Sequence, residues 1–240
     1  VSEDETLERL GHLLGDNAEI RTGQSDYAAA ISVAFAPPTA PNTPNVVLAE
    51  AGTGTGKTLG YIAPASVWSE KNAGPVWIST YTRNLQQQID QELNHLYPDP
   101  DTKARQVVIR KGRENYLCLL NLEDVAERFT TLQRRNAVGV ALTARWVQAT
   151  RDGDLGGDFP SWLVDLVGVG ATLGLADRRG ECIYSACSHY SRCFVEHSIR
   201  KARRARLVVA NHALVMIQAA MGSSDNEERP LPTRYVFDEG

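Results

Sequence analysis

A glycine-rich segment, residues 50–58, constrains this chain most, because it lies between a short apolar run and a stretch with helical character. Alternating glycines let a backbone curl so that successive N–H groups converge on an anion, and a following helix adds its positive N-terminal end. The strict pattern opens with glycine where this chain has alanine, and the alternative interpretation is a flexible turn without a ligand. The order of strand, loop and helix, with Gly-Lys-Thr at the end, favours a phosphate-binding loop. The residues of this predicted loop are Ala51, Gly52, Thr53, Gly54, Thr55, Gly56, Lys57 and Thr58.

Short apolar or β-branched runs alternate with stretches of helical periodicity along much of the chain. We expect helices over residues 26–36, 57–69 and 85–96, with a proline-rich connector over 36–44. Strands alternating with helices predict an α/β fold, in which an open parallel sheet is flanked by helices. The expected strands are residues 46–49, 76–80, 107–109, 207–210 and 235–237.

An acidic pair follows the last of these runs. In an ATPase built on a phosphate loop, a carboxylate at the end of another strand acts near Mg²⁺. Asp238 is the candidate magnesium ligand together with Thr58, and Glu239 is the candidate general base that polarises the attacking water. Lys57 would reach the β- and γ-phosphates of ATP. The alternative for the pair is a solvated loop.

The alternation of strands and helices is interrupted between about residues 110 and 206. In this stretch, helices are expected over 119–129 and 134–150, with a Gly/Asp loop over 151–157. We therefore predict three parts. Residues 1–109 begin the α/β lobe, residues 110–206 form a mostly helical insert, and residues 207–240 return to the lobe.

All four cysteines lie in the predicted insert, at positions 118, 182, 187 and 193. No secretory signal or membrane-length apolar run is present, so a reducing, cytoplasmic compartment is expected and disulfides are not. Four thiolates suit a 4Fe–4S cluster. Zinc prefers a tighter pair, and its further candidate ligands are His189, His197 and His212. Four buried free thiols are the remaining alternative. No partner for His212 can be identified from the sequence.

Several segments together resemble the DinG-type helicases, relatives of the XPD helicases of superfamily 2. Residues 20–24 resemble the adenine-sensing glutamine motif, 50–58 motif I, and 79–88 motif Ia. The resemblance continues in residues 111–118, which lead into the first cluster cysteine, in the spacing of the later cysteines, in 209–214, and in a DEAH-type motif at 238–240.

This resemblance implies a RecA-like α/β lobe with an inserted cluster domain. It also implies a 5′→3′ ATP-dependent DNA helicase of DNA repair or replication that tracks single-stranded or forked DNA. It implies a 4Fe–4S cluster on Cys118, Cys182, Cys187 and Cys193. It also implies nucleotide contacts from Arg21 and Gln24, and DNA contacts from Thr80, Arg83 and Gln86.

The chain starts without Met and stops after the acidic pair, so we interpret it as a fragment holding one motor lobe. A second RecA-like lobe would supply arginine fingers. We expect the fragment to be monomeric, to bind nucleotide weakly and to hydrolyse it poorly.

A net charge of −4 gives no general reason to expect nucleic acid, but residues 198–206 carry a run of cations that includes Arg203 and Arg204. These cations either grip DNA phosphates or form a solvated helix face. Two other functions are open: a different phosphate-loop ATPase with a zinc insert, and a non-enzymatic, redox-responsive DNA-binding module.

Overall fold

Four parallel strands form one sheet in the computed structural model, in the order β2-β3-β1-β4. Val76 of β1 is in register with Leu207 of β3 on one side and with Arg234 of β4 on the other. Among the described residues, β2 pairs only with β3. The predicted parallel α/β fold is confirmed. The strands are β1 (Val76–Thr80), β2 (Val107–Ile109), β3 (Leu207–Asn211) and β4 (Arg234–Phe237).

The described residues divide into two compact units. Unit 1 comprises residues 1–110 and 202–240, and unit 2 comprises residues 111–201. The structure describes residues 1–15, 21–40, 43–132, 137–168, 172, 174–177, 181–221 and 233–239.

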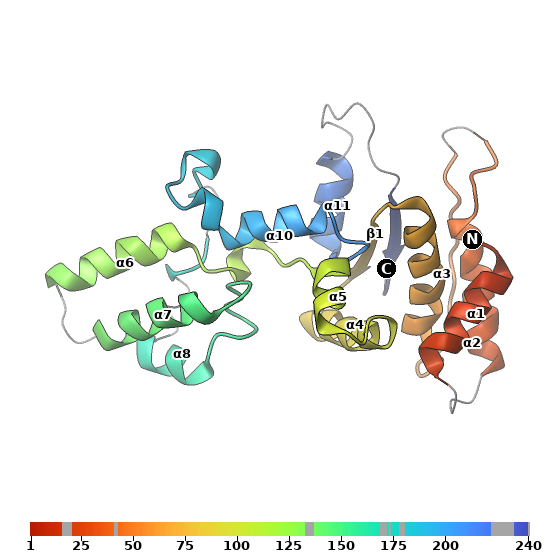
Figure 1. Ribbon diagram of the computed structural model, residues 1–240, viewed down its shortest axis with the longest axis horizontal. Coiled ribbons are helices and arrows are strands. Elements are labelled where there is room, and N and C mark those ends of the chain that lie inside the picture. Colours follow the sequence, from red (N-terminus) through yellow and green to blue (C-terminus); the bar gives the residue numbers. More distant parts are fainter. Residues whose placement is uncertain are drawn as a thin grey trace. The chain divides into compact units, whose positions relative to one another are not determined.

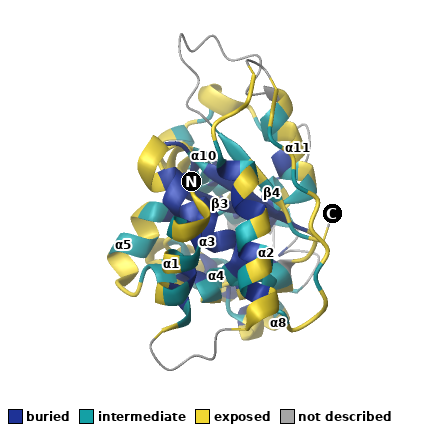
Figure 2. Ribbon diagram, turned by 90° about the vertical axis from the view of Figure 1, so that its right-hand side faces the viewer, coloured by how far each residue is buried: buried dark blue, intermediate teal, exposed yellow. Residues whose placement is uncertain are grey.

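The helices of unit 1 cover both faces of the sheet (Figure 1). Val76 and Ile78 of β1 face a core built with α1–α4, whereas Trp77 between them faces the side of α11. This alternation is the period-two pattern of a strand that is buried on both faces. Figure 2 shows the buried residues of α3 and β3 in the interior of this unit. The helices are α1 (Glu3–Leu14), α2 (Thr22–Ser32), α3 (Lys57–Asn72), α4 (Arg83–Leu96), α5 (Pro100–Gln106) and α11 (His212–Met221), with a 3-10 turn η1 (Val33–Phe35).

Helix α1 is not among the sequence-based predictions, although its start carries a recognisable signal. The Ser2 hydroxyl accepts a hydrogen bond from the Glu5 backbone N–H at 3.2 Å, and the Glu5 carboxylate accepts one from the Ser2 N–H at 2.9 Å. This reciprocal pair is a capping box. Hydrogen bonding to Lys71, and then to the Ser2 backbone, lowers the pKa of Glu5 to about 2.

The predicted strand over residues 46–49 is wrong for this structure. Val46 and Leu48 are 74% and 96% exposed, and the segment joins no ladder among the described residues. Asn45 instead donates a hydrogen bond to the carbonyl of Ala36 at 3.0 Å. A strand is stabilised by its cross-strand partners, so a short apolar run without a partner carries no strand of its own.

Unit 2 has a small core of its own. Leu117, Leu122 and Leu175 are buried together, with Trp146 and Phe194 packed against them. Bridges pair Tyr116 with Asp154 and Leu117 with Ala176. The predicted helices correspond to α6 and α7, although residues 134–136 lie outside the described residues. The elements are η2 (Arg113–Asn115), α6 (Leu119–Leu132), α7 (Ala137–Ala149), α8 (Ser161–Val167), η4 (Tyr184–Ala186), η5 (Tyr190–Arg192) and α10 (Phe194–Ala202), whose last residue belongs to unit 1.

In the part of the chain that the structure describes, no helix has both the length and the apolar character needed to cross a membrane.

Candidate nucleotide site and cysteine cavity

The predicted phosphate loop owes its shape to two glycines. Gly54 and Gly56 both have φ of 79°, a left-handed conformation that L-residues rarely adopt. A Cβ on Gly56 would lie 2.2 Å from Nε2 of Gln24, so a side chain there would also displace the Gln24 amide. Gly52 shows neither constraint. Two of the three alternating glycines are therefore required by the observed backbone.

Helix α3 begins directly after this loop, without a side-chain cap. Its N-cap is Gly56, and no side chain accepts from the first turn there. The first N–H groups of a helix need acceptors from outside it. Lys57 and Thr58, both half-buried, occupy the first two helical positions. Free N–H groups, a helix N-terminus and a lysine together suit a phosphate group.

Arg21 and Gln24 lie beside the loop, at the start of α2. The Arg21 guanidinium donates to the carbonyl of Gly54 at 2.8 Å, and the Gln24 amide donates to the carbonyl of Gly56 at 3.0 Å. Their neighbour in the proposed glutamine motif, Ile20, lies outside the described residues. These two side chains tie the glutamine-motif segment to the backbone of the phosphate loop.

The acidic pair follows β4 at the carboxyl edge of the sheet. The backbone N–H of Asp238 donates to the carbonyl of Ser79 in β1 at 2.8 Å. Its carboxylate accepts a hydrogen bond from the hydroxyl of Tyr61 in α3 at 3.1 Å. Glu239 is exposed, with φ of 58°. Asp238 is thus fixed against the helix that begins at the phosphate loop, whereas Glu239 faces solvent.

Burial, together with the negative charge of Asp238, raises the pKa of two tyrosines, Tyr27 and Tyr61. Burial raises the pKa of Tyr61 far above its usual value, the charge of Asp238 raises it further, and the Thr58 side chain opposes both effects. Burial and then Asp238 also raise the pKa of Tyr27. The Tyr61 phenol therefore stays protonated at neutral pH and acts as the hydrogen-bond donor.

His212 has a partner that the sequence did not reveal. Its Nδ1 is hydrogen-bonded to the hydroxyl of Ser79 at the neighbouring strand end. The rings of Tyr81 and Phe237 lie 6.3 and 6.1 Å from its own ring, centroid to centroid. The sequence offered no means of identifying this partner, because Ser79 lies on a strand far away in the sequence.

The proposed DNA-contacting residues differ in accessibility. Thr80 is fully buried and Gln86 is 4% exposed. The side chain of Arg83 lies outside the described residues, although its backbone begins α4. Arg203 and Arg204 are exposed and follow the end of α10. The cationic run therefore does not continue as one helical face.

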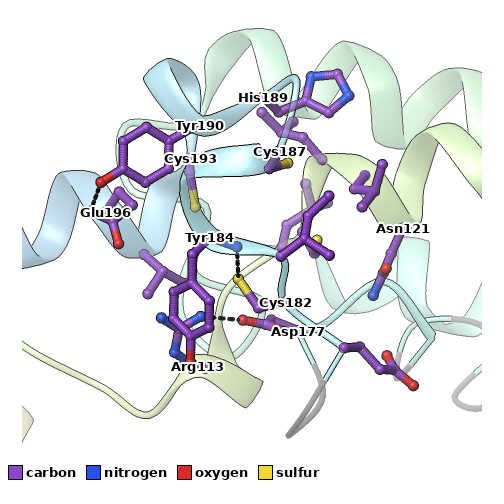
Figure 3. A pocket seen from close by; sticks show the side chains of 17 residues that line it. Arg113, Asn121, Asp177, Cys182, Tyr184, Cys187, His189, Tyr190, Cys193 and Glu196 are labelled. Atoms are coloured by element: carbon purple, nitrogen blue, oxygen red, sulfur yellow. Dashed lines mark hydrogen bonds and ion pairs between the residues drawn. The ribbon is translucent and has the colours of Figure 1, made fainter.

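All four cysteines line one cavity of unit 2. Cys118 directly precedes α6, whereas Cys187 and Cys193 each follow a one-turn 3-10 helix that starts with tyrosine and serine. Figure 3 shows Cys182, Cys187 and Cys193 around this cavity. The insert thus gathers four thiols that are separated by up to 75 residues of sequence, 118 to 193.

Arg113 holds one wall of this cavity. Its guanidinium donates to Asp177 at 2.7 Å and lies 4.9 Å from the ring centre of Tyr184. Burial lowers the pKa of Arg113, but hydrogen bonds to Asp177 and to the Cys182 sulfur outweigh that effect and raise it. The Tyr184 backbone N–H also donates to the Cys182 sulfur at 3.4 Å. Arg113 and Tyr184 therefore both interact with the Cys182 sulfur.

The cavity is not arranged around a single metal ion. Among the described residues, no three His, Cys, Asp or Glu side chains are close enough to hold one. His189 is bonded to Glu123 at 2.8 Å and His197 to the Ser191 carbonyl at 2.8 Å, so both have protein partners. Four sulfurs on one cavity nevertheless suit a cluster in which each thiolate binds a different iron. Burial raises the pKa of Cys118.

Tyr61 is the site residue that sequence reasoning missed. It stands three residues after Thr58 and four after Lys57, on the same side of a helix. That spacing was a usable signal for a side chain at the phosphate site. Its bond to Asp238 was not predictable, because 177 residues separate the two partners.

Taken together, a parallel sheet, a glycine loop at the start of α3 and an acidic residue at the end of β4 are consistent with the RecA-like fold of phosphate-loop proteins. No family model matches the chain. Individual relatives do match, and they narrow this class.

The chain is 30% identical over 230 residues to the ATP-dependent DNA helicase YoaA of Haemophilus influenzae, covering 95% of the chain and 34% of that protein. It is 32% identical to the ATP-dependent helicase DinG of Mycobacterium tuberculosis, over 88% of the chain and 33% of that protein. It is 32% identical to the 3′-5′ exonuclease DinG of Bacillus subtilis, over 80% of the chain and 20% of that protein. The chain is therefore related to the DinG-type helicases and corresponds to one part of such a protein.

Proposed function

We propose that this chain is the ATP-binding lobe of an ATP-dependent DNA helicase. The observation that carries the proposal is the similarity, over 95% of the chain, to a protein named an ATP-dependent DNA helicase. The chain spans about a third of that relative. The geometry supports the nucleotide part, because Asp238 is bonded to the helix that starts at the phosphate loop.

In this proposal ATP binds with its phosphates on the backbone N–H groups of residues 52–58. Lys57 neutralises the β- and γ-phosphates, and Arg21 and Gln24 shape the loop from the adenine side. Thr58 and Asp238 offer the oxygen ligands that Mg²⁺ prefers. When bound, the ion neutralises charge on the phosphates. Glu239, which is exposed after β4, would orient and deprotonate the attacking water.

Hydrolysis and movement need more than this chain. A second RecA-like lobe would contribute arginine fingers to the γ-phosphate, so the chain by itself is expected to bind nucleotide and hydrolyse it poorly. The whole motor would act 5′→3′ on single-stranded or forked DNA in repair or replication. Arg203 and Arg204, which are exposed, would contact phosphates of the strand.

Unit 2 would carry a 4Fe–4S cluster on Cys118, Cys182, Cys187 and Cys193. The shared cavity and the donors to Cys182 support this assignment. The cluster would supply a rigid centre for the insert, held by thiolates.

Equilibrium binding of a fluorescent ATP analogue to the 240-residue chain tests the nucleotide part. Lys57→Ala should weaken binding in Mg²⁺ more than tenfold, because its ammonium contacts the phosphates. Lys71→Ala is the matched control, since it removes a lysine from the other end of the same helix, where Lys71 pairs with Glu5. Equal affinities of the two variants would contradict the phosphate loop.

Strand separation tests the helicase part, in a protein that joins this chain to a second lobe. Substrates with a 5′ tail should be unwound in an ATP-dependent reaction, and substrates with a 3′ tail should not. Unwinding of only the 3′-tailed substrate would reverse the proposed polarity. ATP-independent binding that responds only to oxidation would favour the redox-responsive DNA-binding module.

A further inference from the structure

We propose that Tyr61 is a positioning residue that holds the Asp238 carboxylate opposite Thr58, so that Mg²⁺ meets two oxygen ligands already facing each other. This inference rests on the proposed nucleotide-binding function and deepens it. It assigns a task to a buried side chain that the phosphate-loop pattern does not include.

The Tyr61 hydroxyl contacts one proposed metal ligand, Asp238, and its residue lies about one helical turn after the other, Thr58. Tyr61 is 1% exposed, and its hydroxyl donates to Oδ2 of Asp238 at 3.1 Å. Thr58 precedes it by three residues on α3, and its side chain also interacts with this hydroxyl. Side chains three residues apart lie on the same face of a helix. A single phenol therefore links the phosphate loop to the end of β4.

Among the described residues, the other hydrogen bond of Asp238 holds only its backbone. The N–H of Asp238 is bonded to the Ser79 carbonyl, which fixes the main chain but leaves the side chain free to rotate. β4 is an edge strand, and Phe237 is 49% exposed, so packing contributes little at this end. Among the described residues, the hydrogen bond from the Tyr61 hydroxyl is therefore what orients the Asp238 carboxylate.

The bond leaves the carboxylate able to bind a metal ion. A carboxylate has two oxygens with about four acceptor positions, and Tyr61 uses one position of Oδ2. Mg²⁺ demands near-octahedral geometry, which makes its binding sensitive to how each ligand is oriented. Preorienting a ligand raises affinity because the ordering cost is met before binding.

Tyr61→Phe isolates the hydroxyl, because the ring that fills the core remains. The measurement is the Mg²⁺ concentration that half-saturates binding of fluorescent ADP to the 240-residue chain, at fixed nucleotide. We expect this midpoint to rise about five- to tenfold, in line with the loss of one hydrogen bond of typical net strength. Nucleotide affinity in EDTA should change less than about twofold, since the phosphate loop is intact.

Tyr27→Phe is the matched control. It removes a phenolic hydroxyl from α2, where the Tyr27 ring packs near Gly60, and no hydrogen bond joins it to Asp238 among the described contacts. Its Mg²⁺ midpoint should match that of the unmodified chain. A second test uses Asp238→Asn, in whose background Tyr61→Phe should no longer move the midpoint.

The outcomes separate this inference from the function on which it rests. If the unmodified chain binds nucleotide with or without Mg²⁺ and Tyr61→Phe leaves the midpoint unchanged, Tyr61 has only a structural role and the inference fails. If the unmodified chain binds no nucleotide at all, the proposed function fails and the inference falls with it. A thermal melt of each variant checks that its fold persists. If Tyr61→Phe lowers the melting temperature, the comparison of Asp238→Asn with and without Tyr61→Phe shows whether the change in the Mg²⁺ midpoint depends on the Asp238 carboxylate.

Discussion

The phosphate-loop end of unit 1 and the cysteine cavity of unit 2 are organised in different ways. At the first, side chains already bind one another: Gln24 holds Gly56, and Tyr61 holds Asp238. At the second, four thiols share a cavity, but no three ligating side chains of the described residues meet. Hydrogen bonds of the protein can order one site before its ligand arrives. The other is expected to acquire its final geometry with the metal.

The sharpest test of this contrast is Cys118→Ser. Anaerobically purified chain should contain about four irons and four sulfides and show thiolate-to-iron absorption, and the variant should lose most of its iron because one ligand is gone. Nucleotide affinity of unit 1 should change less than about twofold, since its site is held by its own bonds.

Ser185→Ala is the control for this experiment, because it alters an exposed neighbour of Cys187 and leaves every thiol in place. Zinc without iron in the unmodified chain would overturn the cluster assignment. It would point instead to another phosphate-loop ATPase with a zinc insert. Full iron content in Cys118→Ser would remove that cysteine from the ligand set.

Ile78→Ala is expected to have a smaller effect, on the stability of unit 1 and not on the cysteine cavity of unit 2. Ile78 is fully buried in the central strand of unit 1, so the substitution should lower the free energy of unfolding by about 2–5 kcal/mol through lost burial and a cavity. Denaturant titration followed by tryptophan fluorescence measures it. Iron content should stay unchanged.

Val33→Ala is the companion variant, because Val33 is 57% exposed and its truncation should cost less than about 0.5 kcal/mol. Loss of iron in Ile78→Ala would show that order in unit 2 depends on the core of unit 1, which would weaken the contrast between the two sites.

The smallest effect concerns the ion pair that joins α1 to α3. Arg9 donates to both oxygens of Glu70, at 3.0 and 2.6 Å, and these bonds lower the pKa of Glu70 despite partial burial. A lowered folded pKa adds stability above the unfolded value of about 4.3, and that stability is lost as the pH falls through the folded value. Glu70→Gln should cost about 0.5–1 kcal/mol at pH 7, since solvent screens the pair.

The difference between Glu70→Gln and the unmodified chain should shrink as the pH falls through the lowered folded pKa of Glu70, because the protonated carboxyl is then neutral like the glutamine. Glu8→Gln, at an exposed position of α1, serves as control. A Glu70→Gln effect that is independent of pH would mean that packing, and not charge, joins the two helices.

Local sequence pattern was sufficient where burial and partners coincide. Residues 76–80 were predicted as a strand and form one, because β1 is buried and paired on both sides. Residues 46–49 have the same apolar character but are not a strand, because they meet no partner in the described structure. A pattern in one segment states what that segment can bury, and only the rest of the chain determines whether it does so.

The site shows the same division. The loop residues 51–58 could be recognised locally, because their function depends on neighbouring backbone groups. The bonds from Tyr61 to Asp238 and from Ser79 to His212 join residues 177 and 133 positions apart. The assignments of individual residues to magnesium, to the cluster and to DNA stay predictions.

The strand order has a consequence for how the chain is made. β1 pairs only with β3 and β4, which begin at Leu207 and Arg234, so both its edges are bare while the ribosome is still adding unit 2. A bare apolar strand readily pairs with other chains. During synthesis, a chaperone could usefully shield residues 76–80 until β3 and β4 have been made. Rapid folding of unit 2 would shorten the time for which this strand stays unpaired.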